Sequence, residues 1–299
     1  MRKRKIIACT SHCGLFLIDI ESDEFAVVSR DGNGKKLKYW GMSWSDDRFF
    51  VGFGGLGESW VRVYDTKFNE LKPIYPQKDF IKVGEPHQFL WHDNKLWVCN
   101  THYDRIAIMD GNEWYDWVPT GLKPVDRLRL KGKDYYHINC IWSHGKHLYF
   151  NLHNRERPSQ VRIYSYPGLH LADVYNYVGF NTHNIWKEPN GKNLLVCSSF
   201  EGRIREITNR LRPGTVVCVP QLRYDRVFPR GVVSTDDLIV IGLPVWRRTR
   251  HTRGRVASSI FLYDKKWALR KRYKIKGFGS LYEMRGLNVA DYAHYRGFE

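Results

Sequence analysis

Histidines at the start of three similar segments are the residues best suited to chemistry. His87, His137 and His183 each stand at or near the start of a short run that ends in tryptophan. Neutral imidazole is a good ligand for Zn, Mn or Fe, and three histidines from different segments can enclose one ion. An ion with an incomplete protein shell keeps a position for water, as catalytic metals do. The pattern predicts a divalent transition metal held by these three histidines.

Arginines at equivalent places in two later segments are candidates for holding an anion. Arg230 and Arg285 are each followed by glycine, which allows a close approach of the backbone. A guanidinium matches the oxygens of a carboxylate, sulfate or phosphate. The alternative is a pair of salt bridges between neighbouring segments. The other expected substrate-binding residues are Asn139, Asn184 and, from the basic run Trp246–Arg255, Arg247.

Four side chains are candidates for moving a proton. They are His102, His153, Tyr282 and Glu283. Imidazole, phenol and carboxyl groups commonly act as general acids and bases. Glu283 is the only clear carboxylate in the predicted cluster, which argues against a glycosidase and against an oxygen-rich Ca²⁺ site. The sequence leaves three roles open for the histidines: metal ligation, metal-free acid–base chemistry, or holding water and neighbouring loops.

Four tryptophans indicate the architecture that positions these residues. Trp44, Trp91, Trp142 and Trp186 each end a short strand and precede a polar turn and a second, apolar strand, at intervals of 47, 51 and 44 residues. Such a period, made of short strands, is typical of a β-propeller with four strands per blade. The first strands of the blades should line a central channel, so the candidate residues should meet at one mouth of it.

The two ends of the chain should form one blade together. A fifth full unit begins at Phe228–Ser234, and Leu281–Asn288 has the pattern of a first strand with nothing after it. The N-terminus has the patterns of the missing second, third and fourth strands, at Lys5–Cys9, Leu15–Ile20 and Phe25–Ser29. The sequence therefore predicts an all-β, six-bladed β-propeller, residues 1–299 as one domain, closed by the C-terminal strand. The alternative is a two-domain β-sandwich array.

The composition favours an acidic partner. The 299 residues carry a formal net charge of +17, with a sequence pI of about 9.6, which favours an anionic small molecule, a glycan or nucleic acid, although no nucleic-acid-binding motif is present. Three of the six cysteines, Cys99, Cys140 and Cys197, lie in apolar strand contexts, so buried thiols in a reducing, cytoplasmic setting are expected. Neither a signal peptide nor an apolar stretch of membrane-spanning length is predicted.

The repeats resemble the six-bladed propellers of the NHL, gluconolactonase and strictosidine-synthase-like group. The likeness lies in strings such as Lys95–Asp110, where an apolar strand leads through Asn-Thr to a second apolar strand ending in Asp. The calcium site of gluconolactonases, built from Glu, Asn and Asp, is not matched by the histidine-rich set. The predicted centre looks more like propeller enzymes that hold a metal with histidine, such as oligogalacturonate lyases and antibiotic-linearising lyases. That resemblance implies elimination chemistry on an anionic or activated substrate.

Two hypotheses about function follow. The first is a metal-dependent lyase or hydrolase that acts on an anionic carbohydrate or peptide-like substrate in the central pocket. The second is a binding module without chemistry, which presents its basic face to an acidic protein, glycan or nucleic acid.

Overall fold

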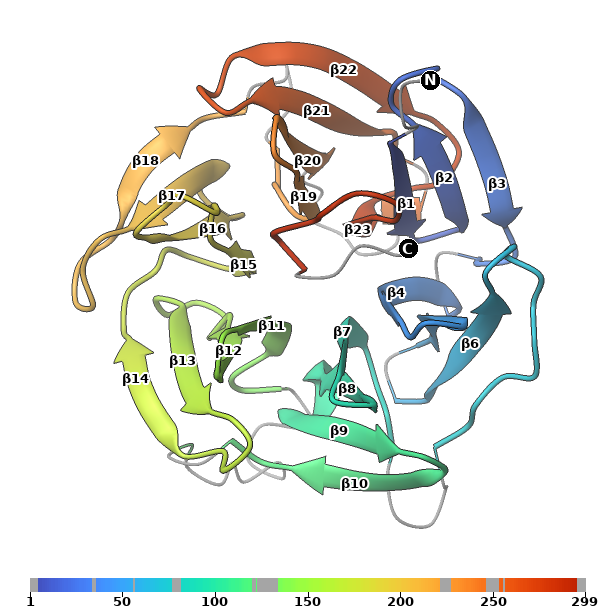
Figure 1. Cartoon of the computed structure of the whole chain (residues 1–299), viewed down its shortest axis with the longest axis horizontal. Coiled ribbons are helices and arrows are strands. Elements are labelled where there is room, and N and C mark those ends of the chain that lie inside the picture. The colour runs from blue at the N-terminus through green and yellow to red at the C-terminus, as the bar shows by residue number, and fades with distance from the viewer. Residues whose placement is uncertain are drawn as a thin grey trace.

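The expected all-β propeller is confirmed. The computed structural model describes residues 5–33, 36–55, 57–76, 82–119, 122, 134–220, 227–245, 253–254 and 256–294. Within these residues the chain forms six antiparallel sheets that stand in a ring as blades (Figure 1). We number the blades I to VI, beginning with the one that contains both ends of the chain. One 3₁₀ turn, η1 (Thr101–Tyr103), is resolved in full, and no helix of the described residues is long and apolar enough to cross a membrane.

Each blade extends outward from the centre of the ring, and its strands are named in that order (Figure 1). Blade I contains β23 (Leu281–Gly286), β1 (Ile6–Ser11), β2 (Leu15–Asp19) and β3 (Phe25–Ser29). Blade II contains β4 (Lys38–Trp44), β5 (Arg48–Gly54) and β6 (Ser59–Asp65). Blade III contains β7 (Pro86–His92), β8 (Lys95–Asn100), β9 (Arg105–Asp110) and β10 (Glu113–Trp117). Blade IV contains β11 (Ile138–His144), β12 (His147–Leu152), β13 (Gln160–Ser165) and β14 (Leu171–Tyr175). Blade V contains β15 (Thr182–Trp186), β16 (Leu194–Ser198), β17 (Arg203–Ile207) and β18 (Thr215–Cys218). Blade VI contains β19 (Val232–Ser234), β20 (Leu238–Pro244), β21 (Ser258–Asp264) and β22 (Leu269–Ile275).

The ring is closed by pairing of the two ends of the chain, as the sequence predicts. β23 runs antiparallel to β1, with Ile7 opposite Gly286 and Cys9 opposite Met284. This pairing hydrogen-bonds β23, the inner strand of blade I, to β1, so the edges along which these two strands meet are not left open. The C-terminal strand therefore completes the N-terminal blade.

Blade II departs from the expected four strands. Its sheet has three strands among the described residues, and single bridges at Glu70 and Ile74 take the place of the fourth. Pro73 and Pro76 interrupt this stretch. Proline has no backbone N–H to donate to a ladder, so a continuous outer strand cannot form here.

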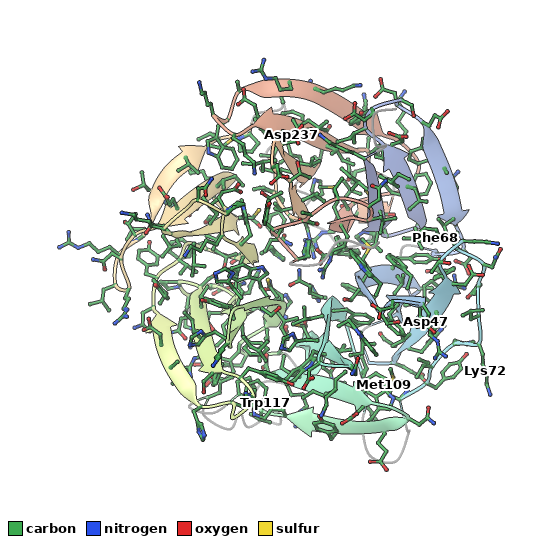
Figure 2. The ribbon with its side chains drawn as sticks, viewed as in Figure 1. Asp47, Phe68, Lys72, Met109, Trp117 and Asp237 are labelled. Carbon is green, nitrogen blue, oxygen red and sulfur yellow. The ribbon has the colours of Figure 1, made fainter. Side chains whose placement is uncertain are left out.

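The core lies between neighbouring blades, and side chains fill this space (Figure 2). The repeated tryptophans pack in several of these contacts between blades. Trp142 is 1% exposed and packs with Ile185 and Val196 of blade V, while Trp186 is fully buried against blade VI. Burial of a large aromatic side chain contributes roughly 2 kcal/mol or more to stability. The tryptophan repeat that reveals the blades is thus also what packs them together.

Irregular backbone marks the beginning of several inner strands. Glu85, His137, Asn181 and Asn184 have φ between +49° and +52°, and the ladders beside them shift register. Residues other than glycine adopt this left-handed conformation at a cost of about 1 kcal/mol or more, and such strain gathers at functional sites. These bulges break the strict alternation of a strand and re-aim the side chains beside them.

Candidate functional site

A polar cavity of about 230 Å³ lies at the mouth of the ring where the inner strands begin. All six blades contribute to it. Among the described residues it is lined by His12, Lys38, Trp40, Glu85, His87, His137, His153, Arg155, Asn181, His183, Phe228, Arg230, Arg253 and Tyr282. The structure thus brings together six of the predicted site residues, namely His87, His137, His153, His183, Arg230 and Tyr282.

Three of these histidines are anchored through Nδ1. His87 Nδ1 lies 2.9 Å from the carbonyl oxygen of Glu85, and His183 Nδ1 lies 3.0 Å from that of Asn181. His137 Nδ1 contacts the buried carboxylate of Asp134. Carbonyl and carboxylate oxygens accept, so each Nδ1 carries the proton and donates it. The other ring nitrogen, Nε2, is then the basic one.

His153 has the opposite tautomer. Its Nδ1 accepts the backbone N–H of Arg155 at 3.2 Å, so in the neutral ring the proton is on Nε2. The ring of His153 lies 4.5 Å from that of His137 and 5.4 Å from that of His183, centroid to centroid. Nε2 of His153 is therefore a hydrogen-bond donor, whereas Nε2 of His87, His137 and His183 is the unprotonated nitrogen.

The buried histidines are held neutral. Burial lowers the pKa of His87, His153 and His183 well below the ordinary value, and the nearby positive charge of Arg230 lowers each pKa further. An imidazole that stays neutral near neutral pH can donate a hydrogen bond from its protonated nitrogen and accept one at the other.

The guanidinium of Arg230 is held in place at the cavity. It is 7% exposed, its Nε donates to the carbonyl oxygen of Tyr282 at 3.3 Å, and its guanidinium carbon lies 4.5 Å from the centre of the Tyr282 ring. Burial lowers the pKa of Arg230 to about 10, so it stays charged at neutral pH. Because Nε is used by the protein, the two terminal nitrogens can meet a planar anion in the cavity.

The cavity as a whole is cationic and has one aromatic wall. Lys38, Arg155 and Arg253 line it together with Arg230, whereas Glu85 is the single carboxylate among its described lining residues. The rings of Trp40 and Tyr282 stack at 4.6 Å to form the wall. Such a site suits a small anion.

The backbone that presents His137 is held from the neighbouring blade. The carboxylate of Asp104, which follows η1 in blade III, accepts the backbone N–H of His137 at 2.7 Å and that of Tyr136 at 3.1 Å. Asp134, 6% exposed, is shared between His137 Nδ1 and the guanidinium of Arg155. Two carboxylates therefore fix the orientation of one imidazole.

Tyr282 is hydrogen-bonded to another residue of the site. His12 Nδ1 lies 3.3 Å from the carbonyl oxygen of Ser280, so its Nε2 accepts, and the hydroxyl of Tyr282 lies 3.0 Å from that nitrogen. Burial is the main cause that lowers the pKa of His12 to about 3. The phenolic proton of Tyr282 is thus directed at a neutral histidine.

Glu283 and Arg285 do not line this cavity. Glu283 is 2% exposed and lies between the two mouths of the ring, with Oε1 3.4 Å from Gln88 Nε2 and 3.5 Å from Asn184 Nδ2. Arg285 lies 3.7 Å from Glu283 and donates to the carbonyl oxygen of Phe89. It lines a separate cavity of about 170 Å³ with His294.

The remaining predicted residues lie elsewhere. Asn139 donates to the carbonyl oxygen of Thr182 at 2.9 Å, and Asn184 accepts the N–H of Gly231 at 2.7 Å, so both join neighbouring blades. His102 belongs to η1, packs its ring at 4.9 Å from that of Tyr103 and is not among the residues that line the cavity. Arg247 lies outside the described residues.

Several residues of the site were not predicted from the sequence. Lys38 could have been found, since it opens β4 two residues before Trp40 and alternate residues of a strand share a face. Asp134 and Arg155 carry no such signal, because both lie in loops whose paths the repeat does not determine.

The predicted metal site stays a prediction. The Nδ1 anchors of His87, His137 and His183 are the arrangement that metal-binding histidines need to present Nε2. Within the part of the chain that the structure describes, however, no group of three or more His, Cys, Asp or Glu side chains is arranged to hold an ion. Binding an ion would require some of these rings to turn.

Glu283 predicts a specific pH dependence of stability. Burial raises its pKa from 4.5 to about 7, so the folded protein binds this proton more tightly than the unfolded chain. The unfolding free energy contributed by this group is therefore lost as the pH rises from 4.5 to about 7, by roughly 3 kcal/mol. In Glu283→Gln, urea unfolding across this range should show a correspondingly flatter pH dependence. Asp291, whose pKa burial raises to about 6, leaves a residual slope of the same sign. Parallel curves for wild type and variant would contradict the assignment.

Comparison with known proteins supports the fold. No family model and no curated protein matches the chain. A chain of the nidogen/laminin complex is similar over 95% of this chain and 98% of its own length, with a TM-score of 0.63 and 14% identity. The β-propeller domain of Cps50 (Swd1) from Myceliophteria thermophila is similar over 93% of this chain and 82% of that one, with a TM-score of 0.51 and 12% identity. At these identities the likeness shows the propeller fold alone.

Proposed function

We propose that the chain is an enzyme that binds a carboxylated sugar in the central cavity and catalyses an elimination by proton transfer. The observation that carries this proposal is the position of Arg230, a buried and charged guanidinium, beside neutral histidines of two opposite tautomers. An anion site alone needs no such set of imidazoles.

The proposed reaction uses the residues as follows. Arg230 pairs with the carboxylate of the sugar, which favours the negative charge that develops when the neighbouring carbon loses its proton. His153 donates a hydrogen bond from Nε2 to the developing oxyanion, as a neutral imidazole can. His137 accepts the carbon-bound proton at Nε2.

The elimination is then completed by the same base. The electron pair of the C–H bond forms a carbon–carbon double bond, and the bond from the adjacent carbon to the leaving oxygen breaks. His137 returns its proton to that oxygen, so the products are an unsaturated acid and an alcohol. Asp134 favours the imidazolium that exists between the two transfers.

A metal-assisted version of the same reaction is the second candidate, and the three Nδ1 anchors favour it. His87, His137 and His183 would hold a Zn, Mn or Fe ion, which would polarise the substrate carboxylate as a Lewis acid. In that version His137 is a ligand and cannot be the base, so the two candidates assign different roles to one residue.

Turnover of acidic oligosaccharides tests the proposal and separates the two candidates. Untagged protein is incubated with oligomers of glucuronate or galacturonate, and the unsaturated product is followed by its absorbance and by mass spectrometry. We expect turnover that survives a strong chelator. Activity lost on chelation and restored by one metal per chain, but not in His87→Ala, would select the metal-assisted version. Binding without turnover of any oligomer would favour a binding module, like a propeller found in a protein complex.

A further inference from the structure

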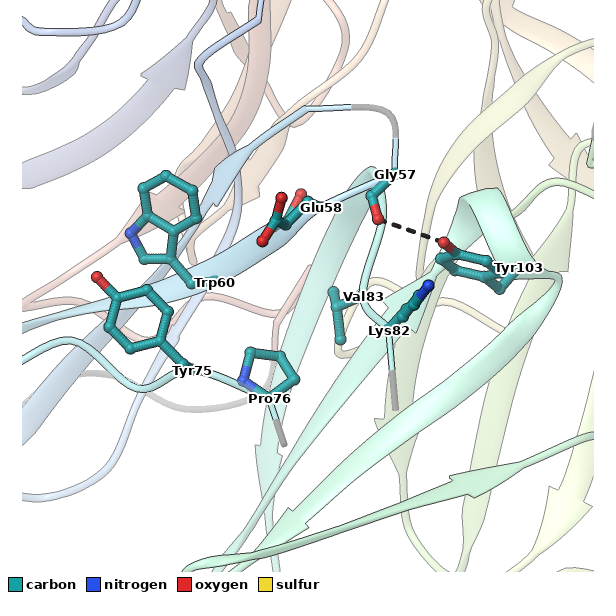
Figure 3. A pocket seen from close by; sticks show the side chains of 9 residues that line it. Gly57, Glu58, Trp60, Tyr75, Pro76, Lys82, Val83 and Tyr103 are labelled. Atoms are coloured by element: carbon teal, nitrogen blue, oxygen red, sulfur yellow. Dashed lines mark hydrogen bonds between the residues drawn. The ribbon is translucent and has the colours of Figure 1, made fainter. Parts of the chain in front are cut away.

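A second and larger cavity lies beside the central one. It has a volume of about 530 Å³, which falls within the roughly 300–1,000 Å³ typical of ligand pockets, whereas the central cavity is smaller. Figure 3 shows the side chains that line it. They are Gly57, Glu58, Ser59, Trp60, Tyr75, Pro76, Lys82, Val83 and Tyr103.

One short segment connects the two cavities. Lys82 and Val83 line the larger cavity, and Glu85, two residues further along, lines the central one. The segment is fixed to η1, because the backbone N–H of His102 donates to the carbonyl oxygen of Gly84. Both cavities open on the face where the inner strands begin. The linings of the two cavities are thus separated along this segment by Gly84 alone.

The larger cavity has an aromatic platform with a polar rim. The rings of Trp60 and Tyr75 lie 5.9 Å apart at an angle of 32°, and Tyr75 is 60% exposed. Glu58 lies between Trp60 and Gly57, and Lys82 lies on the side of Tyr103 (Figure 3). The hydroxyl of Tyr103 donates to the carbonyl oxygen of Gly57 at 3.3 Å and closes one end.

We propose that this cavity binds a neutral sugar residue, next to the acidic sugar in the central cavity. The weakly polar face of a pyranose packs on Trp60 and Tyr75, while its hydroxyls donate to the Glu58 carboxylate and accept from Lys82. Val83 and Pro76 are the aliphatic contributions among the described lining residues, too few to bury the side chains of an apolar peptide. The substrate is thus an oligosaccharide of mixed charge.

The proposal rests on the proposed function for the acidic end of the ligand, but its own test does not need that end. Saturation-transfer NMR is recorded with the neutral disaccharides cellobiose, xylobiose, maltose and lactose. We expect at least one to bind the wild-type protein and to bind Tyr75→Ala about tenfold more weakly, the loss expected for one stacked ring. Tyr75 is mostly exposed, so the variant should fold. Glu58→Gln should weaken binding as well.

Two controls make the result specific. Tyr115→Ala removes a tyrosine that is 41% exposed on the outer strand β10, and it should leave binding unchanged. Arg230→Ala should also leave neutral-sugar binding unchanged, although it disables the central cavity. Absence of binding for all four disaccharides, or equal binding by wild type and Tyr75→Ala, overturns the proposal. If the disaccharides bind as expected while acidic sugars do not bind at all, the proposed function fails and this site stands.

Discussion

Arg230→Ala is expected to weaken the binding of acidic sugars by roughly a hundredfold or more. The guanidinium is buried, its charge lowers the pKa of His183, and it is held by Tyr282 in a fixed orientation. Removing one partner of a buried, hydrogen-bonded charge pair costs about 2–5 kcal/mol, because the other charge is left unpaired. Calorimetric titration with glucuronate, galacturonate and their oligomers measures the loss.

Two variants show whether the effect belongs to this guanidinium. Arg230→Lys keeps the charge but loses the planar pair of donors, so it should recover only part of the affinity. Arg210→Ala removes a cation whose side chain is 66% exposed and pairs with Asp173 at the surface, and it should bind as the wild type does. If Arg230→Ala retains full affinity, the anion is bound elsewhere, and the proposed orientation of the substrate is wrong.

Asp134→Asn is expected to lower kcat by roughly a hundredfold to ten-thousandfold with little change in KM. Asp134 accepts from His137 Nδ1 and so fixes the tautomer in which Nε2 is basic. An amide can present its NH₂ to Nδ1 and reverse that tautomer, and it offers no charge to the imidazolium. General base catalysis contributes about this much in enzymes. His137→Ala should lose a similar factor, and the double variant should lose little more than either single one.

The measurements must distinguish the loss of a correctly positioned His137 from a general loss of structure. The limb of the kcat pH profile that reports the base should shift toward lower pH in the residual Asp134→Asn activity, because the amide no longer favours the imidazolium of His137, while the urea midpoint changes little. Asp116→Asn removes a comparable carboxylate that pairs with Arg105 away from the cavity and should leave kcat unchanged. Equal losses in Asp134→Asn and Asp116→Asn would show that the effect is a general loss of structure.

The fold could be predicted because the repeat is strong. The tryptophans at one place in four successive units pack between neighbouring blades, so their spacing reveals the blades. The unpaired pattern at Leu281–Asn288 predicted the closure correctly. The repeat did not predict that blade II would have three strands among the described residues. Pro73 and Pro76 interrupt the fourth strand locally and do not change the period of the repeat.

The site could be predicted only where it follows the strands. Residues that begin inner strands, such as His87 and His183, reach the mouth in the structure. Tyr282 reaches the mouth too. Arg285 lies three residues further along β23, which is about 10 Å deeper at the rise of a strand, and it lines the separate cavity of about 170 Å³. The partners that decide the chemistry, Asp134 and Arg155, come from loops, and tautomers depend on contacts that no periodicity encodes.

Exchange of a carbon-bound proton with solvent tests the central claim most directly. Glucuronate and galacturonate, which have no sugar leaving group on the carbon next to the acidic one, are incubated in D₂O with the wild-type protein and with His137→Ala and Arg230→Ala, and ¹H NMR follows the proton next to the carboxylate. The account predicts loss of this signal with the wild-type protein and its retention with both variants. Retention of the signal with wild-type protein that binds the sugar acid in the same sample would show that the cavity binds without moving a proton, and would contradict the enzymatic account.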